Sequence, residues 1–257
     1  MIIASYVLHY GKEYLAWSIR SIQDQVDAIQ VLYSPKPSFS YQSDVPCPES
    51  EEELKAEAHR FLHQGKKLFW DSGVWPGEGA HRDQAIGMAS SRGASLILVV
   101  DADELWDPAE LAGQLAAADA APQKDTLTPF VHFWRSFDHI CSDPSRPVRI
   151  VKPSGSSLRY SDQKVPVLHY GYAQSEAITR YKIAIHGHRG EWRADWLEKK
   201  FMAWDPDIPM QDVHPTCGWN PDFNDYFWNP RKVDPEISRA ADPLVFDHPN
   251  NGKGVIR

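Results

Sequence analysis

The sequence has few cysteines, no long apolar run and no excess of positive charge. Its 257 residues contain only three cysteines, Cys47, Cys141 and Cys217, and these are far apart. An odd number of separated thiols favours free thiols in a reducing compartment over a disulfide framework or a zinc site. No stretch approaches the roughly 20 apolar residues of a spanning helix, and Met1–Leu8 lacks the basic start of a signal peptide. We therefore expect a soluble, cytoplasmic protein without a membrane span.

The charge balance is acidic. The formal net charge is −8 at pH 7 and the sequence pI is near 5.7. Such a chain has no overall attraction to nucleic acid or to anionic membranes. A hydrophobic content of 42% is ample for a core, and the length fits one large domain or a domain with an appendage. Ten Trp and ten Tyr residues supply core volume and aromatic faces that can stack on sugars and bases.

The first part of the chain predicts a β-α-β unit. Ile2–Leu8 and Ala28–Tyr33 have the composition of buried strands, and Lys12–Gln23 carries apolar residues at helical spacing. This order favours a parallel sheet. Further strands are expected at 67–70, 96–100, 128–134, 148–151 and 165–170, and further helices at 51–64, 79–92, 108–120, 177–186 and 192–203. From Asp205 onward the many prolines and aromatic residues predict extended segments packed on the body.

An acidic motif, Asp101-Ala102-Asp103-Glu104, directly follows the apolar strand Leu96–Val100. In open α/β sheets, ligands bind outside the carboxyl ends of the strands. Two carboxylates at that point can hold Mg²⁺ or Mn²⁺, which prefer oxygen ligands and are often shared with substrate phosphates. The alternative is that Asp103 or Asp107 only caps the helix that begins near Pro108.

These pieces together resemble a known family. The segment Gly79-Ala80-His81-Arg82-Asp83-Gln84-Ala85 precedes the strand that ends in Asp-x-Asp. This order is similar to family-two-type glycosyltransferases of the GT-A fold, although Asp83 stands where Asn is more usual. Residues 169–172 and 178–182 are similar to stretches of small bacterial members. The resemblance covers roughly residues 1 to 190 and implies an α/β fold with a mostly parallel sheet flanked by helices.

The resemblance also implies a division of the chain and a set of ligands. A GT-A domain would span 1–204, with a nucleotide-sugar half at 1–107 and an acceptor half at 108–204, followed by an irregular C-terminal extension at 205–257. Mn²⁺ or Mg²⁺ would be held by Asp101, Asp103 and a late histidine, His169, with His186, His188 and His214 as competing candidates. The donor, a UDP-sugar in our interpretation, would contact Tyr6, His9, Tyr33, Arg82, Asp83, Asp101 and Lys182.

An inverting transfer needs a carboxylate that deprotonates the acceptor hydroxyl. Asp138 is our candidate because it follows the aromatic run Phe133–Phe137, which suits an acceptor pocket. Asp143, Asp162 and Glu176 are alternatives, and a retaining transfer is the better interpretation if none of them serves.

Two other functions remain open at this stage. Sugar-phosphate nucleotidyl transfer uses a similar fold and metal, but it normally has a glycine-rich loop with a lysine after the first strand, where this chain has His9-Tyr10-Gly11-Lys12. A non-catalytic carbohydrate-binding role would leave the two carboxylates without a purpose. The acceptor could be a glycan, a lipid-linked sugar, a protein or a modified nucleobase.

Overall fold

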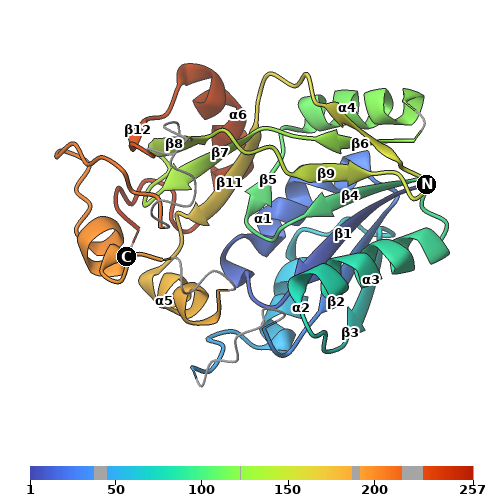
Figure 1. The fold of residues 1–257 in the computed structure, drawn as a ribbon, viewed down its shortest axis with the longest axis horizontal. Coiled ribbons are helices and arrows are strands. Elements are labelled where there is room, and N and C mark those ends of the chain that lie inside the picture. Colours follow the sequence, from blue (N-terminus) through green and yellow to red (C-terminus); the bar gives the residue numbers. More distant parts are fainter. Residues whose placement is uncertain (38–44, 122, 187–191, 216–227, 257) are drawn as a thin grey trace.

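The computed structural model describes residues 1–37, 45–121, 123–186, 192–215 and 228–256. Within these ranges two β-sheets lie side by side, with helices packed on them (Figure 1). The strands of sheet A are β1 (Ile2–Leu8), β2 (Ala28–Tyr33), β3 (Lys67–Ser72), β4 (Leu96–Val100), β6 (Lys124–Leu127), β9 (Val148–Val151) and β10 (Ser157–Tyr160). The strands of sheet B are β5 (Glu104–Leu105), β7 (Phe130–Trp134), β8 (His139–Asp143), β11 (Val167–Tyr172) and β12 (Arg231–Lys232). The helices are α1 (Lys12–Ile22), α2 (Glu51–Arg60), α3 (Glu78–Ser91), α4 (Pro108–Ala120), α5 (Glu176–Ile185) and α6 (Pro235–Val245).

Sheet A has the strand order β10-β6-β9-β4-β1-β2-β3. The strands β4, β1, β2 and β3 are parallel, whereas β9 runs antiparallel to both β4 and β6. Helices cover this sheet on both faces, which confirms the predicted α/β class with a mostly parallel, helix-flanked sheet. The pairing of β1 with β4 places Tyr6 beside Val100, so the loops that follow these two strands lie next to each other.

Strand alternation decides which residues become core. Ala4, Tyr6 and Leu8 of β1 point to the face that α1, α2 and α4 cover, where they join one hydrophobic cluster. Ile3 points to the opposite face, where it packs in a cluster with Ala89 of α3. Tyr6 is therefore fully buried, and its hydroxyl group forms a hydrogen bond of 3.0 Å with the hydroxyl of Ser18.

Helix α1 lies between the two sheets and has almost no exposed apolar surface. Leu15 and Ile19 pack in the core of sheet A, whereas Tyr14 and Trp17 pack in the core of sheet B. At its N-terminus the carboxylate of Glu49 accepts the backbone N–H groups of both Gly11 and Lys12, at 2.7 and 2.9 Å. A carboxylate at this helix end satisfies unpaired N–H groups and complements the positive end of the helix dipole.

Much of the tryptophan content fills a third core. Trp134, Trp196, Trp204 and Trp228 are buried together with Phe201 on the outer side of sheet B. The richness in aromatic residues thus serves packing first, because large rings bury 150–250 Å² each.

The C-terminal part differs in one respect from the extended segments that the sequence predicts. Residues 235–245 form helix α6, whose Ile237, Ala240, Ala241 and Leu244 pack in the core of sheet B. The signal is present in the sequence: Pro235 occupies the first helical position and the apolar residues follow at helical spacing. The predicted helix at 192–203 is a shorter π-helix, Leu197–Met202.

The structure tests two further predictions only in part, those on the free thiols and on membrane-spanning helices. Cys47 and Cys141 are free thiols, and Cys217 lies outside the described residues. No helix within the described ranges is both long enough and apolar enough to cross a membrane.

A buried histidine connects the C-terminal segment to α1. The ring of His248 stacks on Tyr14, with ring centroids 4.6 Å apart. Its Nε2–H donates to the backbone oxygen of Glu13 at 2.8 Å, and its Nδ1 accepts the N–H of Asn250 at 3.1 Å. Because one nitrogen donates and the other accepts, these contacts fit the neutral ring. Burial lowers the pKa of His248 to about 4.

This arrangement predicts that the free energy of unfolding falls at acidic pH. The unfolded chain binds the proton more tightly, so His248 contributes its full stability above about pH 6.5 and loses it as the pH falls towards 4. The loss is at most about 3 kcal/mol in the free energy of unfolding. Urea denaturation at several pH values should give a flatter profile for His248→Phe than for the wild type. The same change at the exposed His59 should leave the profile unaltered; equal slopes in wild type and His248→Phe would contradict the account.

Candidate functional site

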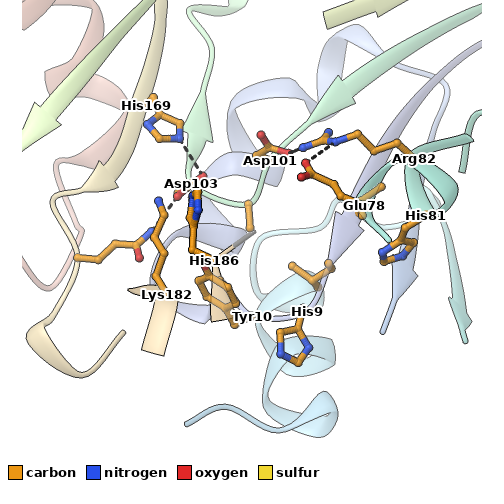
Figure 2. A pocket seen from close by; sticks show the side chains of 15 residues that line it. His9, Tyr10, Glu78, His81, Arg82, Asp101, Asp103, His169, Lys182 and His186 are labelled. Carbon is orange, nitrogen blue, oxygen red and sulfur yellow. Dashed lines mark hydrogen bonds and ion pairs between the residues drawn. The ribbon is translucent and has the colours of Figure 1, made fainter. Parts of the chain in front are cut away.

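A cavity of about 410 Å³ opens at the carboxyl ends of β1 and β4. Residues from the loop after β1, the start of α3, the acidic motif, β11 and α5 line it. Figure 2 shows its polar groups: Asp101 points towards Arg82 and Glu78 on one side, and Asp103 points towards His169 and Lys182 on the other. The site therefore combines three carboxylates, two cations and several imidazoles around one hollow.

The backbone of the acidic motif is held close to the loop after β1. Gly11 has a φ of +139°, and a Cβ atom placed there would lie 2.4 Å from the Cβ of Ala102. Only glycine fits this conformation and this contact. A small residue at position 102 is required for the same reason, which accounts for the alanine between the two aspartates.

Two arginines clamp Asp101. Its Oδ1 accepts from the guanidinium of Arg82 at 3.1 Å, and its Oδ2 accepts from that of Arg149 at 2.7 Å. Burial alone would raise the pKa of Asp101, but the guanidinium groups of Arg149 and Arg82 outweigh it and hold the pKa well below its usual range. Asp101 is thus an ionised carboxylate whose two oxygens already have cationic partners.

Beneath this clamp lies a buried ion pair. Glu104 has no exposed surface and Arg149 is 7% exposed. The Arg149 guanidinium donates to Oε1 of Glu104, whose Oε2 accepts the backbone N–H of Asp101 at 3.2 Å. Burial raises the pKa of Glu104, and the Arg149 guanidinium opposes that shift by stabilising the carboxylate. Arg149 therefore connects both carboxylates and fixes the turn on which the acidic motif lies.

Asp103 faces the other half of the cavity. Its Oδ2 accepts from the side-chain amide of Gln174 at 2.8 Å, and its Oδ1 lies 3.5 Å from Nε2 of His169. Burial raises the pKa of Asp103, and the nearby ammonium of Lys182 lowers it. In contrast to Asp101, this carboxylate has no guanidinium partner in the described chain.

A glycine makes room for the ring of His169. A Cβ atom at Gly171 would lie 2.2 Å from Cε1 of that ring. Burial and the neighbouring His132 and Lys182 lower the pKa of His169 well below its usual value, so the ring is neutral. Gly171 thus leaves the space that the imidazole of His169 occupies beside Asp103.

The structure brings together six of the predicted site residues. All of them line the cavity: His9, Arg82, Asp101, Asp103, His169 and Lys182. His186, the competing histidine, also lines it, whereas His188 lies outside the described residues and His214 is not among the lining residues.

Four predicted residues are not at the cavity. Tyr6 and Tyr33 are buried in the core of sheet A, because strand alternation turns them to the face that α1 and α2 cover. Asp83 is exposed on α3, one position beyond Arg82, and lines a separate groove with Arg149. Asp138 is exposed at the turn between β7 and β8, with its N–H bonded to Ser136, so the structure does not bring it to the cavity.

Sequence reasoning missed several residues of the site. Tyr10, Glu78, His81 and Gln174 line the cavity, and Arg149 supports it from β9. Glu78 has a sequence signal, since it lies four residues before Arg82 on one helix face, and the two side chains pair at 2.9 Å. Arg149 has none, because its partners lie 45 and 48 residues away.

The described residues contain no ready-made cluster of three or more His, Cys, Asp or Glu side chains arranged to hold a metal ion. Two side chains nevertheless offer suitable atoms, Oδ1 of Asp103 and Nε2 of His169. Mg²⁺ and Mn²⁺ commonly take one or two protein ligands and complete their shell with substrate phosphates and water. The residues present fit such a shared site.

No family model and no curated protein matches the chain, whereas solved structures do. A TarS 1–349 chain of S. aureus aligns with a TM-score of 0.44 and 11% identity over 72% of this chain and 64% of that one. A 4-diphosphocytidyl-2C-methyl-D-erythritol synthase of Anaerococcus prevotii has a TM-score of 0.36 and 10% identity over 60% and 70% of the two chains. Glucosyl-3-phosphoglycerate synthase of Mycobacterium tuberculosis, solved with Mn²⁺, UDP-glucose and phosphoglyceric acid, has a TM-score of 0.31 and 15% identity over 52% and 44%.

This chain spans less than two thirds of the TarS and glucosyl-3-phosphoglycerate synthase chains. The identities are 15% or less and the TM-scores are below 0.5, so the activity of this chain does not follow from these likenesses.

The buried clamp gives a stability prediction. Arg149→Met should lower the free energy of unfolding by about 3–5 kcal/mol, because it leaves Glu104 and Asp101 without their shared cation. Glu104→Gln in the same chain should restore part of the loss. Arg231→Met, which breaks an exposed pair with Asp234, should cost no more than about 1 kcal/mol. Urea denaturation measures all three; a cost for Arg149→Met as small as that for Arg231→Met would refute the clamp.

Proposed function

We propose that the chain is a glycosyltransferase that binds a nucleoside-diphosphate sugar in this cavity and transfers the sugar to an acceptor hydroxyl. The observation that carries the proposal is the placement of Arg82 and Lys182 on opposite sides of the two aspartates, at the carboxyl ends of β1 and β4. Cations held at a strand end are suited to a diphosphate leaving group, whose negative charge grows as the glycosidic bond breaks.

A divalent metal is part of the proposal. Asp103 and His169 would hold Mn²⁺ or Mg²⁺, which when bound supplies Lewis acidity to the diphosphate. Asp101, predicted from the sequence as a ligand, would act differently, since both of its oxygens have guanidinium partners. Its role would be to hold Arg82 towards the phosphates.

The remaining lining residues suit the nucleoside. Nδ1–H of His9 donates to the backbone oxygen of Ser34, and its Nε2 accepts from the hydroxyl of Tyr181, both at 2.7 Å. The His9 ring is thereby held in place with both nitrogens engaged. His9 and Tyr10, which follow β1, would present ring faces and edges to the base.

Nucleotidyl transfer is the less suitable function for this site. It would need the loop after β1 to cradle a triphosphate with backbone N–H groups and a lysine. Here the N–H groups of Gly11 and Lys12 both donate to Glu49, and the ammonium of Lys12 pairs with Glu53. The positions that would hold the phosphates are occupied by the chain's own carboxylates.

The acceptor and the cellular location belong to the same proposal. An acceptor glycan, lipid-linked sugar, protein or modified nucleobase would approach Asp103 from sheet B, and the cytoplasm is the location that the free thiols favour. Asp138 has no assigned role, because it lies on an exposed turn.

Metal-dependent nucleotide binding tests the proposal. Calorimetry should show that Mn²⁺ strengthens UDP binding to the wild type by at least roughly tenfold, and that Asp103→Asn removes most of this gain. Asp103→Asn preserves the volume of the side chain and lacks the charge that attracts the cation.

The matched control is Asp119→Asn, which changes an exposed carboxylate of α4 and should leave the gain at the wild-type value. UDP affinity that is the same with and without Mn²⁺ would rule out the metal, and no UDP binding under either condition would rule out the donor.

A further inference from the structure

Two residues outside the cavity, His132 and Asp143, extend the site across sheet B. His169 on β11 pairs in register with His132 on the neighbouring β7, and their Nδ1 atoms are 2.7 Å apart. Nε2 of His132 lies 2.6 Å from Oδ2 of Asp143 on the next strand, β8. The side chains form a continuous chain of contacts from Asp143 through His132 and His169 to Asp103.

The protonation of this chain can be followed from its far end. Oδ1 of Asp143 accepts the N–H of Ser145 at 2.7 Å. Burial alone would raise the pKa of Asp143, but hydrogen bonds with His132 and Ser145 lower it below its usual value, so both oxygens of the ionised carboxylate can only accept. His132 must therefore carry its proton on Nε2 and donate it to Asp143. With its single ring proton on Nε2, His132 would have a bare Nδ1, which can only accept.

The second histidine follows from the first. Two imidazole nitrogens 2.7 Å apart form a hydrogen bond only if one donates and the other accepts. Because Nδ1 of His132 accepts, the proton lies on Nδ1 of His169. Its Nε2 is then bare and faces Oδ1 of Asp103 at 3.5 Å, so a lone pair and a carboxylate oxygen point into the same space.

We infer that His132 and Asp143 are positioning residues, which fix the tautomer of His169 so that its bare Nε2 faces the cavity beside Asp103 as a ligand for a divalent cation. The inference rests on the proposed metal site. His132 is 6% exposed and stacks on Trp228, with ring centroids 4.4 Å apart, so packing holds its plane as well. Outer residues of this kind orient a metal-binding imidazole and typically change metal affinity by 10- to 100-fold.

The tautomers can be read directly from ¹⁵N chemical shifts of imidazole nitrogens in the metal-free protein, with His132→Asn used for assignment. The expected result is a proton on Nε2 of His132 and on Nδ1 of His169. A proton on Nε2 of His169, or two protons on His132, would overturn the inference, because His169 would then donate to Asp103.

The effect on the metal site is measured as the gain in UDP affinity when Mn²⁺ is added. His132→Leu should weaken the affinity for Mn²⁺ roughly 10- to 100-fold and thereby remove most of this gain. His132→Asn should retain most of it, since its amide oxygen can replace Nδ1 as the acceptor. His139→Asn, which changes a buried histidine of β8 bonded to Ser136, is the matched control and should keep the wild-type gain.

The outcomes separate the two proposals. An unchanged gain in His132→Leu, beside a clear gain in the wild type, would refute the positioning role alone. If Mn²⁺ does not strengthen UDP binding to the wild type, the metal site is contradicted. The positioning role of His132 and Asp143 then fails with it, whatever tautomers the ¹⁵N shifts report.

Discussion

The guanidinium of Arg149 is the constraint on which the site depends. It brings a cation from β9 to two carboxylates of one short turn, Asp101 and Glu104, where the chain passes from β4 of sheet A into β5 of sheet B. Burying these charges is costly unless each has a partner, so the turn has one low-energy arrangement. That arrangement directs Asp101 to Arg82 and leaves Asp103 facing the cavity.

The two sheets contribute different groups to the site. Sheet A supplies the parallel strand ends and, through the start of α3, the guanidinium of Arg82, whereas Lys182 comes from α5, which follows β11 of sheet B. Sheet B supplies His169 and the row of side chains behind it, and its β11 pairs with β5 directly after Asp103. Helix α1 packs against both sheets, so it fixes the distance between the two halves.

The sequence predicts the local parts of this arrangement well. Strand β4 and the carboxylates after it follow from an apolar run and its polar end, and Arg82 and His169 follow from the family resemblance. Arg149 could not be predicted, since Val-Arg-Ile-Val is an ordinary strand pattern and its register against β4 is set by tertiary pairing. Tyr6 and Asp138 show the converse: both have suitable chemistry, but strand alternation buries one and a hairpin turn exposes the other.

The central claim is that this cavity activates a nucleotide sugar. The most direct measurement is the release of nucleoside diphosphate when the protein is incubated with a panel of nucleotide sugars and Mn²⁺, without an added acceptor, since such a site slowly transfers sugar to water. The account predicts release from one donor, dependent on Mn²⁺ and lost in Asp103→Asn. Donor that stays intact across the whole panel, or equal release by Asp103→Asn, would contradict it.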